Sequence, residues 1–194
     1  MRSKSSGRTN FQTFFVSQEP SRCPRIPALI RVGKRLAKQK LTSNAGGDLS
    51  VRFGRRVVIT TAGADLGSLT SNDFVEVVDF DFSRVLAVII GSDPPSPELP
   101  LHWLIYSAFD DIQAVVQTCD EEVLKLAEKR NDLPQTQERQ PCGSFELARE
   151  TLRVLRHSKH VILKQHGVIS VGNTLDEAYK ETIECYQTTL DSKL

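Results

Sequence analysis

Apolar residues recur at helical spacing in several stretches of the chain. Between residues 28 and 38, leucine, isoleucine and valine fall on one helix face, while arginine and lysine fall on the other. The same reasoning predicts helices over 98–108, 120–129, 144–156 and 174–190. Asp120 and Ser144 are good N-caps, and Thr174 with Glu177 has the spacing of a capping box.

Short β-branched runs between these helices predict strands. The clearest is VRFGRRVVIT (51–60), which is typical of a hairpin that bends at Gly54. Further strands are expected over 74–80, 85–90 and 112–118, and as a hairpin over 161–164 and 168–171 that turns at His166 and Gly167. Because no βαβ rhythm repeats, the pattern favours an α/β layer architecture around a mixed or mostly antiparallel sheet.

The N-terminal part of the chain differs from the rest. Residues 1–10 are polar and basic, which predicts a flexible tail, with an organellar transit peptide as the alternative. Residues 11–27 combine three phenylalanines with three prolines and are expected to form an extended arm that docks on the body through its aromatic rings. We therefore divide the chain into an N-terminal arm, 1–27, and one domain, 28–194.

Composition restricts the class of protein. The chain has 194 residues, of which 39% are hydrophobic, and its net charge is +1. This charge gives no argument for a nucleic-acid partner, and no apolar run reaches the roughly 18 residues that indicate a membrane span. The four cysteines lie far apart without a C-x-x-C pair, and no signal peptide is evident, so we expect a reducing, cytoplasmic location.

Four segments in order resemble the class II aldolase/adducin family. They are GGDLSVR (46–52), ITTAGADLGSLT (59–70), PSPELPLH (95–102) and LKQHGVISVGNTLDEA (163–178). AVVQTCDEEVL (114–124) and CGSFELA (142–148) extend the resemblance, which spans about residues 28–190. It implies a three-layer α/β fold in which helices flank a central, mostly antiparallel sheet, and it implies assembly as a homotetramer.

The resemblance also implies a chemistry. Enzymes of this family hold a divalent metal, usually zinc, with a His-x-His pair on one strand and a third histidine farther on, beside a glutamate that moves protons. They cleave or isomerise small sugars or sugar phosphates through a metal-stabilised enediolate. A small-molecule sugar or sugar phosphate is therefore the expected partner.

Two of these positions keep their residue type and two do not. The third metal ligand falls on His166 and the proton-moving carboxylate on Glu98, whereas the His-x-His positions hold Gln117 and Cys119. Strand alternation places both replacements on one face. A thiolate ligates zinc well and a glutamine carbonyl ligates it poorly, so we expect zinc to be held weakly or lost. If Glu98 became a ligand, it would no longer be free to carry protons.

The expected substrate-binding residues come from the glycine-rich loops. They are Gly47, Asp48, Thr61, Gly63 and Ser96. Asp48 replaces the asparagine of the family's phosphate cradle, and a carboxylate beside a phosphate dianion costs binding energy, which disfavours a phosphorylated substrate. The two glycines equally suit turns that require a positive φ.

Several single residues have an ordinary structural interpretation. Cys119 suits a small buried hydrophobe, and Cys142 suits a loop cysteine without a role. His102 either approaches the cavity or packs within its helix, and Arg52 either supplies charge to the cradle or lies on the surface.

Two functions stand as alternatives at this point. The first is a metal-dependent aldehyde lyase with a remodelled ligand set, supported by Glu98 and His166. The second is a catalytically silent, adducin-like assembly or binding module, supported by the loss of both strand histidines.

Overall fold

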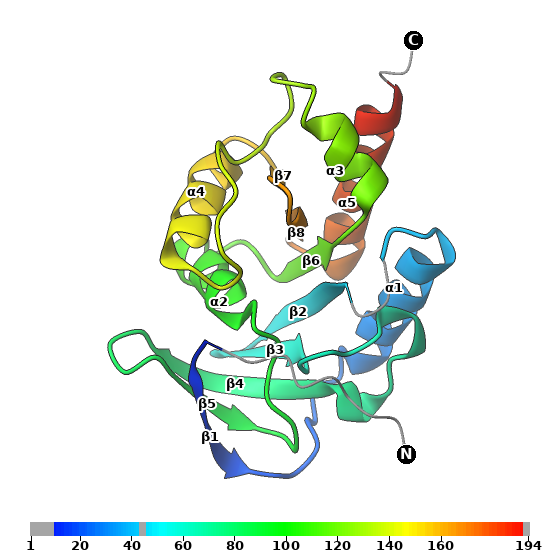
Figure 1. Cartoon of the computed structure of the whole chain (residues 1–194). Helices are drawn as coiled ribbons and strands as arrows, with labels where there is room; N and C mark the ends of the chain where they lie inside the picture. Colours follow the sequence, from blue (N-terminus) through cyan, green and yellow to red (C-terminus); the bar gives the residue numbers. More distant parts are fainter. Residues whose placement is uncertain (1–9, 43–45, 192–194) are drawn as a thin grey trace.

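One sheet of eight strands runs through the protein, with helices on both of its faces (Figure 1). The computed structural model describes residues 10–42 and 46–191. The strands are β1 (Gln12–Ser17), β2 (Gly47–Phe53), β3 (Arg56–Thr60), β4 (Phe74–Asp81), β5 (Leu86–Ile90), β6 (Ala114–Thr118), β7 (His160–Leu163) and β8 (Gly167–Gly172). Their order across the sheet is β1-β5-β4-β3-β2-β6-β8-β7. Within this described sheet only the β1–β5 pair is parallel, so the expected mostly antiparallel sheet is confirmed.

The helices form the two outer layers. They are α1 (Ile26–Lys38), α2 (Leu99–Ala108), α3 (Glu121–Ala127), α4 (Phe145–Leu155) and α5 (Leu175–Leu190), with short 3₁₀ turns η1 (Leu66–Ser68) and η2 (Ser71–Asp73). Helices α2 and α4 cover one face of the sheet, and α1, α3 and α5 cover the other (Figure 1). Each face buries its own apolar cluster, which confirms the three-layer α/β fold. No helix among the described residues is long and apolar enough to span a membrane.

The predicted helices and strands occur within a few residues of their expected bounds. The capping box predicted at the start of α5 is only half formed. Thr174 caps the helix as predicted, since its hydroxyl accepts from the Glu177 N–H at 3.1 Å. The Glu177 carboxylate, however, accepts from the N–H of Asn173 at 2.8 Å rather than from that of Thr174, so the reciprocal half of the capping box is missing.

The N-terminal arm is extended and belongs to the main sheet. Its strand β1 pairs in parallel with β5, at the edge of the sheet (Figure 1). The ring of Phe11 is buried and meets Phe80 edge-on, with 5.4 Å between the ring centroids, and Phe15 packs against the same cluster. Phe14 is 58% exposed, so the docking expected of all three phenylalanines is wrong for this one. The predicted tail, apart from Asn10, lies outside the described residues.

Candidate active site

An open pocket of about 380 Å³ lies where the ends of β2 and β6 meet the loop before α2. Eight of the nine predicted site residues line it, and the exception is Thr61. The full lining is Gly46, Gly47, Asp48, Gly63, Ala64, Ser96, Pro97, Glu98, Gln117, Cys119, Cys142 and His166. These described lining residues include two carboxylates and neither lysine nor arginine, so the pocket wall is acidic.

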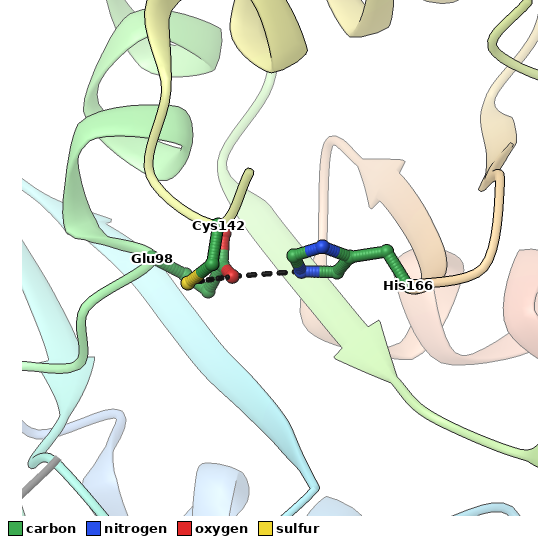
Figure 2. A group of neighbouring side chains, drawn as sticks. All are labelled: Glu98, Cys142 and His166. Atoms are coloured by element: carbon green, nitrogen blue, oxygen red, sulfur yellow. Dashed lines mark hydrogen bonds and ion pairs between the residues drawn. The ribbon is translucent and has the colours of Figure 1, made fainter. Parts of the chain in front are cut away.

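Three side chains from distant parts of the chain converge in this pocket (Figure 2). His166 Nε2 lies 2.8 Å from Glu98 Oε1, and the Cys142 thiol donates to the same oxygen at 2.7 Å. One ligand atom from each residue lies within 4.8 Å of the other two. Imidazole, thiolate and carboxylate together make a donor set that suits zinc.

The charges within this cluster support one another. Burial alone would raise the pKa of Glu98, but the hydrogen bond and positive charge of His166, with the Cys142 thiol, lower it below the ordinary value. Burial works against a charged imidazole, yet Glu98 raises the pKa of His166. Burial and the charge of Glu98 raise the pKa of Cys142. These shifts favour the ionised carboxylate of Glu98, the protonated imidazole of His166 and the neutral thiol of Cys142.

One carboxylate oxygen of the cluster has no partner. The Glu98 side chain is 6% exposed, and its Oε2 atom makes no hydrogen bond within the described structure. Leaving a buried carboxylate oxygen unpaired costs free energy, so an unpartnered oxygen inside a pocket indicates a position that a ligand satisfies.

Local backbone features place each member of the cluster. Glu98 precedes α2, and its N–H donates to Ser96 Oγ at 3.1 Å, which fixes the entry to the helix. His166 projects from the tight turn between β7 and β8. Cys142 depends on Gly143, which has φ +67°, and a Cβ at this position would lie 2.9 Å from the Pro97 carbonyl oxygen. Only glycine therefore lets the loop before α4 close on the loop that carries Glu98.

The structure gives Cys142 a partner that the sequence did not predict, because its thiol donates to Glu98 Oε1 at 2.7 Å. The segment that contains it resembles the family, but the residue type is new there, and the sequence carries no signal that this loop returns to Glu98. Cys119 lines the same pocket, yet it lies outside the group whose ligand atoms converge within 4.8 Å. Its role as a metal ligand stays a prediction.

Asp48 lies beside Gln117 on neighbouring strands and faces the pocket. Thr60 Oγ1 donates to its carboxylate at 2.7 Å, and Ser96 gives a second side-chain hydrogen bond. Burial raises the pKa of Asp48 to about 6 despite these hydrogen bonds. Gly47 keeps this corner tight, since a Cβ on it would lie 2.5 Å from the Gln117 carbonyl oxygen.

Two further residues are structural. Arg52 does not reach the cradle: its guanidinium donates to the backbone carbonyls of Tyr106, Phe109 and Ile112 at the end of α2, at 2.6, 3.0 and 3.2 Å. His102 is completely buried and approaches the pocket only through Gln117, whose Oε1 lies 3.1 Å from its Nε2. Thr61 is buried as well, and its hydroxyl has no partner among the described residues.

Comparisons with known proteins agree with this geometry. The family described as "Class II Aldolase and Adducin N-terminal domain" matches residues 27–189. The chain is 32% identical over 170 residues to the L-fuculose phosphate aldolase of Methanococcus maripaludis, covering 81% of this chain and 89% of the relative. It is 28% identical over 170 residues to the 5-methylthioribulose-1-phosphate/5-deoxyribulose-1-phosphate aldolase of Rhodospirillum rubrum, covering 80% and 74%. A solved L-fuculose 1-phosphate aldolase superposes with a TM-score of 0.75 at 25% identity, covering 90% of this chain and 88% of the other.

Proposed function

The chain belongs to the class II aldolase and adducin family, and we propose that it is a metal-dependent aldehyde lyase that acts on a small sugar or sugar phosphate. The observation that carries this proposal is the convergence of Cys142 and His166 on one carboxylate oxygen of Glu98, while the other oxygen of that carboxylate has no partner among the described residues. Zinc, assembly as a homotetramer and a cytoplasmic location stay predictions.

The residues present fit a zinc ion, although not through the expected pair. His166 would supply a nitrogen ligand, Cys142 a sulfur ligand and Glu98 an oxygen ligand. Three protein ligands leave a position for the substrate, as catalytic zinc sites require. The bound ion supplies Lewis-acid polarisation of a substrate carbonyl and hydroxyl.

Glu98 is suited to carry the proton that aldol cleavage requires. Cleavage breaks a C–C bond next to a hydroxyl-bearing carbon: a base removes the hydroxyl proton, and an acid returns a proton to the carbon that keeps the electron pair. Oε1 of Glu98 is engaged by His166 and Cys142, while Oε2 has no partner. If Oε1 is the oxygen that holds the metal, Oε2 is the oxygen that is placed to accept and return the proton.

The non-catalytic assembly module is the weaker alternative. It rested on the loss of both strand histidines, which left His166 as the one remaining imidazole of the family's set. Cys142 supplies a replacement donor from another loop, and it does so at hydrogen-bond distance from the intact Glu98. The relatives that match over most of this chain include several that are named as sugar-phosphate aldolases and one that is named as a methylthioribulose-1-phosphate dehydratase, which also favours the enzyme.

The test is cleavage of L-fuculose 1-phosphate and of unphosphorylated L-fuculose by zinc-loaded protein, followed as release of the aldehyde product. We expect turnover that a chelator abolishes, and we expect Glu98→Gln to lower kcat by about 10²–10⁴-fold. Glu184→Gln, an exposed change on α5, is the matched control and keeps full activity. Absence of aldehyde from these sugars and from 5-deoxyribulose 1-phosphate, with zinc bound, would contradict the proposal.

A further inference from the structure

A buried chain of polar side chains leads from the core to the pocket. The hydroxyls of Tyr106 and Ser50 lie 2.9 Å apart, and Ser50 Oγ lies 2.7 Å from Nδ1 of His102. On the other side of the ring, His102 Nε2 lies 3.1 Å from Gln117 Oε1. All four residues are at most 4% exposed, so water does not replace any of these contacts.

With the carbonyl oxygen of Gln117 beside Nε2 of His102, one arrangement of the hydrogens satisfies every donor of this chain. In it, Tyr106 donates to Ser50, Ser50 donates to His102 Nδ1, and His102 donates from Nε2 to the carbonyl oxygen of Gln117. In this arrangement every hydroxyl and ring N–H has an acceptor. Burial lowers the pKa of His102 to about 4, which agrees with a neutral ring. A charged ring would donate from both nitrogens, and the Gln117 carbonyl would still face it.

The opposite orientation of the Gln117 amide would leave one buried donor of this chain without an acceptor. If the NH₂ group faced His102, Nε2 would have to accept, and the ring proton would move to Nδ1 and point at Ser50. Ser50 would then donate to Tyr106, and the phenol proton of Tyr106 would have no acceptor along the chain. A buried donor without an acceptor costs free energy, so the amide is held with its oxygen toward His102.

The NH₂ group of Gln117 consequently points at the pocket. Its nitrogen lies 3.5 Å from His166 Nε2, which is beyond the usual length of a hydrogen bond, and that ring nitrogen already contacts Glu98 at 2.8 Å. Two N–H donors thus face the space beside Glu98 and His166, and the carbonyl oxygen is committed elsewhere.

We propose that Gln117 serves this pocket as a hydrogen-bond donor to an oxygen of the substrate, not as a metal ligand, and that His102 is the positioning residue that fixes it. The inference deepens the proposed lyase function and rests on it for the identity of the substrate oxygen. A neutral donor aimed at an oxygen that gains negative charge stabilises the transition state without adding charge to an acidic pocket.

The orientation is tested directly by NMR on the unaltered, metal-free protein. A long-range ¹H–¹⁵N spectrum reports which ring nitrogens of each of the four histidines carry protons, and the His102→Gln variant identifies the His102 signals. We expect a proton on Nε2. A proton on Nδ1 alone would overturn the proposal, because the Gln117 amide would then be flipped. This result does not depend on activity or on zinc.

The consequence for chemistry is tested with Gln117→Met, which keeps the length of the side chain and removes both N–H donors and the carbonyl. Gln187→Met, at an exposed position of α5, is the matched control. We expect the zinc dissociation constant of Gln117→Met to stay within about threefold of the unaltered value, while kcat for sugar cleavage falls by about 100-fold. A zinc affinity weakened 10-fold or more, or an unchanged kcat, would overturn the donor role.

The positioning role of His102 is tested by a double-mutant cycle. His102→Leu frees the Gln117 amide, so its loss of kcat should approach that of Gln117→Met, and the double variant should lose little more than either alone. Fully additive losses would overturn this role. Should the unaltered protein cleave no sugar at all, the proposed function fails, whereas the NMR measurement still decides the orientation of Gln117.

Discussion

At the scale of single residues, the two oxygens of one carboxylate have different surroundings in the candidate site. Oε1 of Glu98 holds the imidazole of His166 and the thiol of Cys142, and Oε2 is left without a partner. A metal competes with protons at both neighbours, since Glu98 raises the pKa of the His166 imidazole and of the Cys142 thiol and metal ligands bind in their deprotonated forms. A bound metal would therefore replace contacts that already satisfy His166, Cys142 and Oε1 of Glu98.

The first prediction distinguishes the two cysteines of the pocket. Cys142→Ala removes a convergent donor, so we expect zinc affinity, measured by competition with a chromophoric chelator, to fall by at least about 100-fold. Cys119→Ala is the matched control because it removes a thiol from the same pocket but from outside the convergent group. A larger loss of zinc affinity in Cys119→Ala than in Cys142→Ala would show that the metal binds at the strand positions Gln117 and Cys119 instead.

The second prediction concerns Asp48. The pKa of Asp48 is about 6 in the folded protein, above the ordinary value of 3.8. Ionisation of Asp48 therefore destabilises the folded protein: this destabilisation is absent below about pH 3.8 and is complete above about pH 6. Asp48→Asn removes this cost, and we expect it to raise the free energy of unfolding by up to about 3 kcal/mol near pH 7 and by nothing near pH 3.5. Urea titrations at both pH values measure the difference. A gain that is equal at both would show that Asp48 is not the titrating group.

The same variant reports on the substrate. A carboxylate in a pocket lined by neither lysine nor arginine repels a phosphate dianion. Asp48→Asn should therefore raise kcat/KM for a sugar phosphate by about 10-fold relative to the unphosphorylated sugar, and Asp176→Asn, at an exposed position of α5, should leave the ratio unchanged. A ratio that falls in Asp48→Asn would show that the carboxylate aids binding of the phosphate.

Residue types in the sequence predicted most of the residues that line the pocket, but they did not predict the contact of Cys142 or the orientation of Gln117. Glu98 and His166 keep the residue types that the resemblance expects and line the predicted pocket, and Asp48 and Gln117 are recognisable as departures from it. The contact of Cys142 with Glu98 could not be predicted, because it depends on how closely the loop before α4 approaches the loop that carries Glu98. Gly143 allows this approach, but a glycine in the sequence does not show where its loop lies. The orientation of Gln117 was equally hidden, since it is set by buried groups on α2 and β2.

At the scale of elements, periodicity predicts helices such as α1 and α4 well because each has a single buried face. Strands β6 and β8 are buried on both faces and were predicted from their short apolar runs. Periodicity does not show which strands pair, and this is why the N-terminal segment was predicted as an arm rather than as a strand of the sheet. Strand β1 depends on non-local pairing with β5, and the segment after it is held by β4. Local patterns carry no information about such contacts.

The third prediction tests how that segment is fastened. The buried carboxylate of Glu76 on β4 accepts from Ser21 Oγ at 2.8 Å, from the Arg22 N–H at 3.1 Å and from Arg56 at 2.7 Å. Glu76→Gln weakens these charge-assisted bonds, and we expect a loss of about 2 kcal/mol in the free energy of unfolding. Glu19→Gln, which removes an exposed carboxylate, should change it by less than about 0.5 kcal/mol.

The difference in free energy of unfolding between the unaltered chain and Glu76→Gln should decrease at acidic pH. Burial raises the pKa of Glu76, but the hydrogen bonds from Arg56, Ser21 and the Arg22 backbone outweigh it, so the folded pKa lies below 4.5. The advantage of the unaltered chain over Glu76→Gln is therefore complete above about pH 4.5 and declines as the pH falls through the lowered pKa. An advantage that grows on acidification would contradict this role.

At the scale of the whole molecule, the fold gathers chemistry from six separate parts of the chain. One pocket is lined by the start of β2, the loop after β3, the loop before α2, the end of β6, the loop before α4 and the turn between β7 and β8. Ligands in layered α/β proteins commonly lie where strand ends and loops converge. The fold keeps these positions together even where the residue types have changed, so a lost ligand can be replaced from a neighbouring loop.

The most direct test is zinc K-edge X-ray absorption on the zinc-loaded protein, compared with Cys142→Ala and Cys119→Ala. The account predicts one zinc per chain with a single sulfur at about 2.3 Å and the remaining ligands nitrogen or oxygen. The sulfur should vanish in Cys142→Ala and persist in Cys119→Ala. A spectrum without sulfur, or one whose sulfur disappears only in Cys119→Ala, would contradict a metal centre built from Glu98, Cys142 and His166.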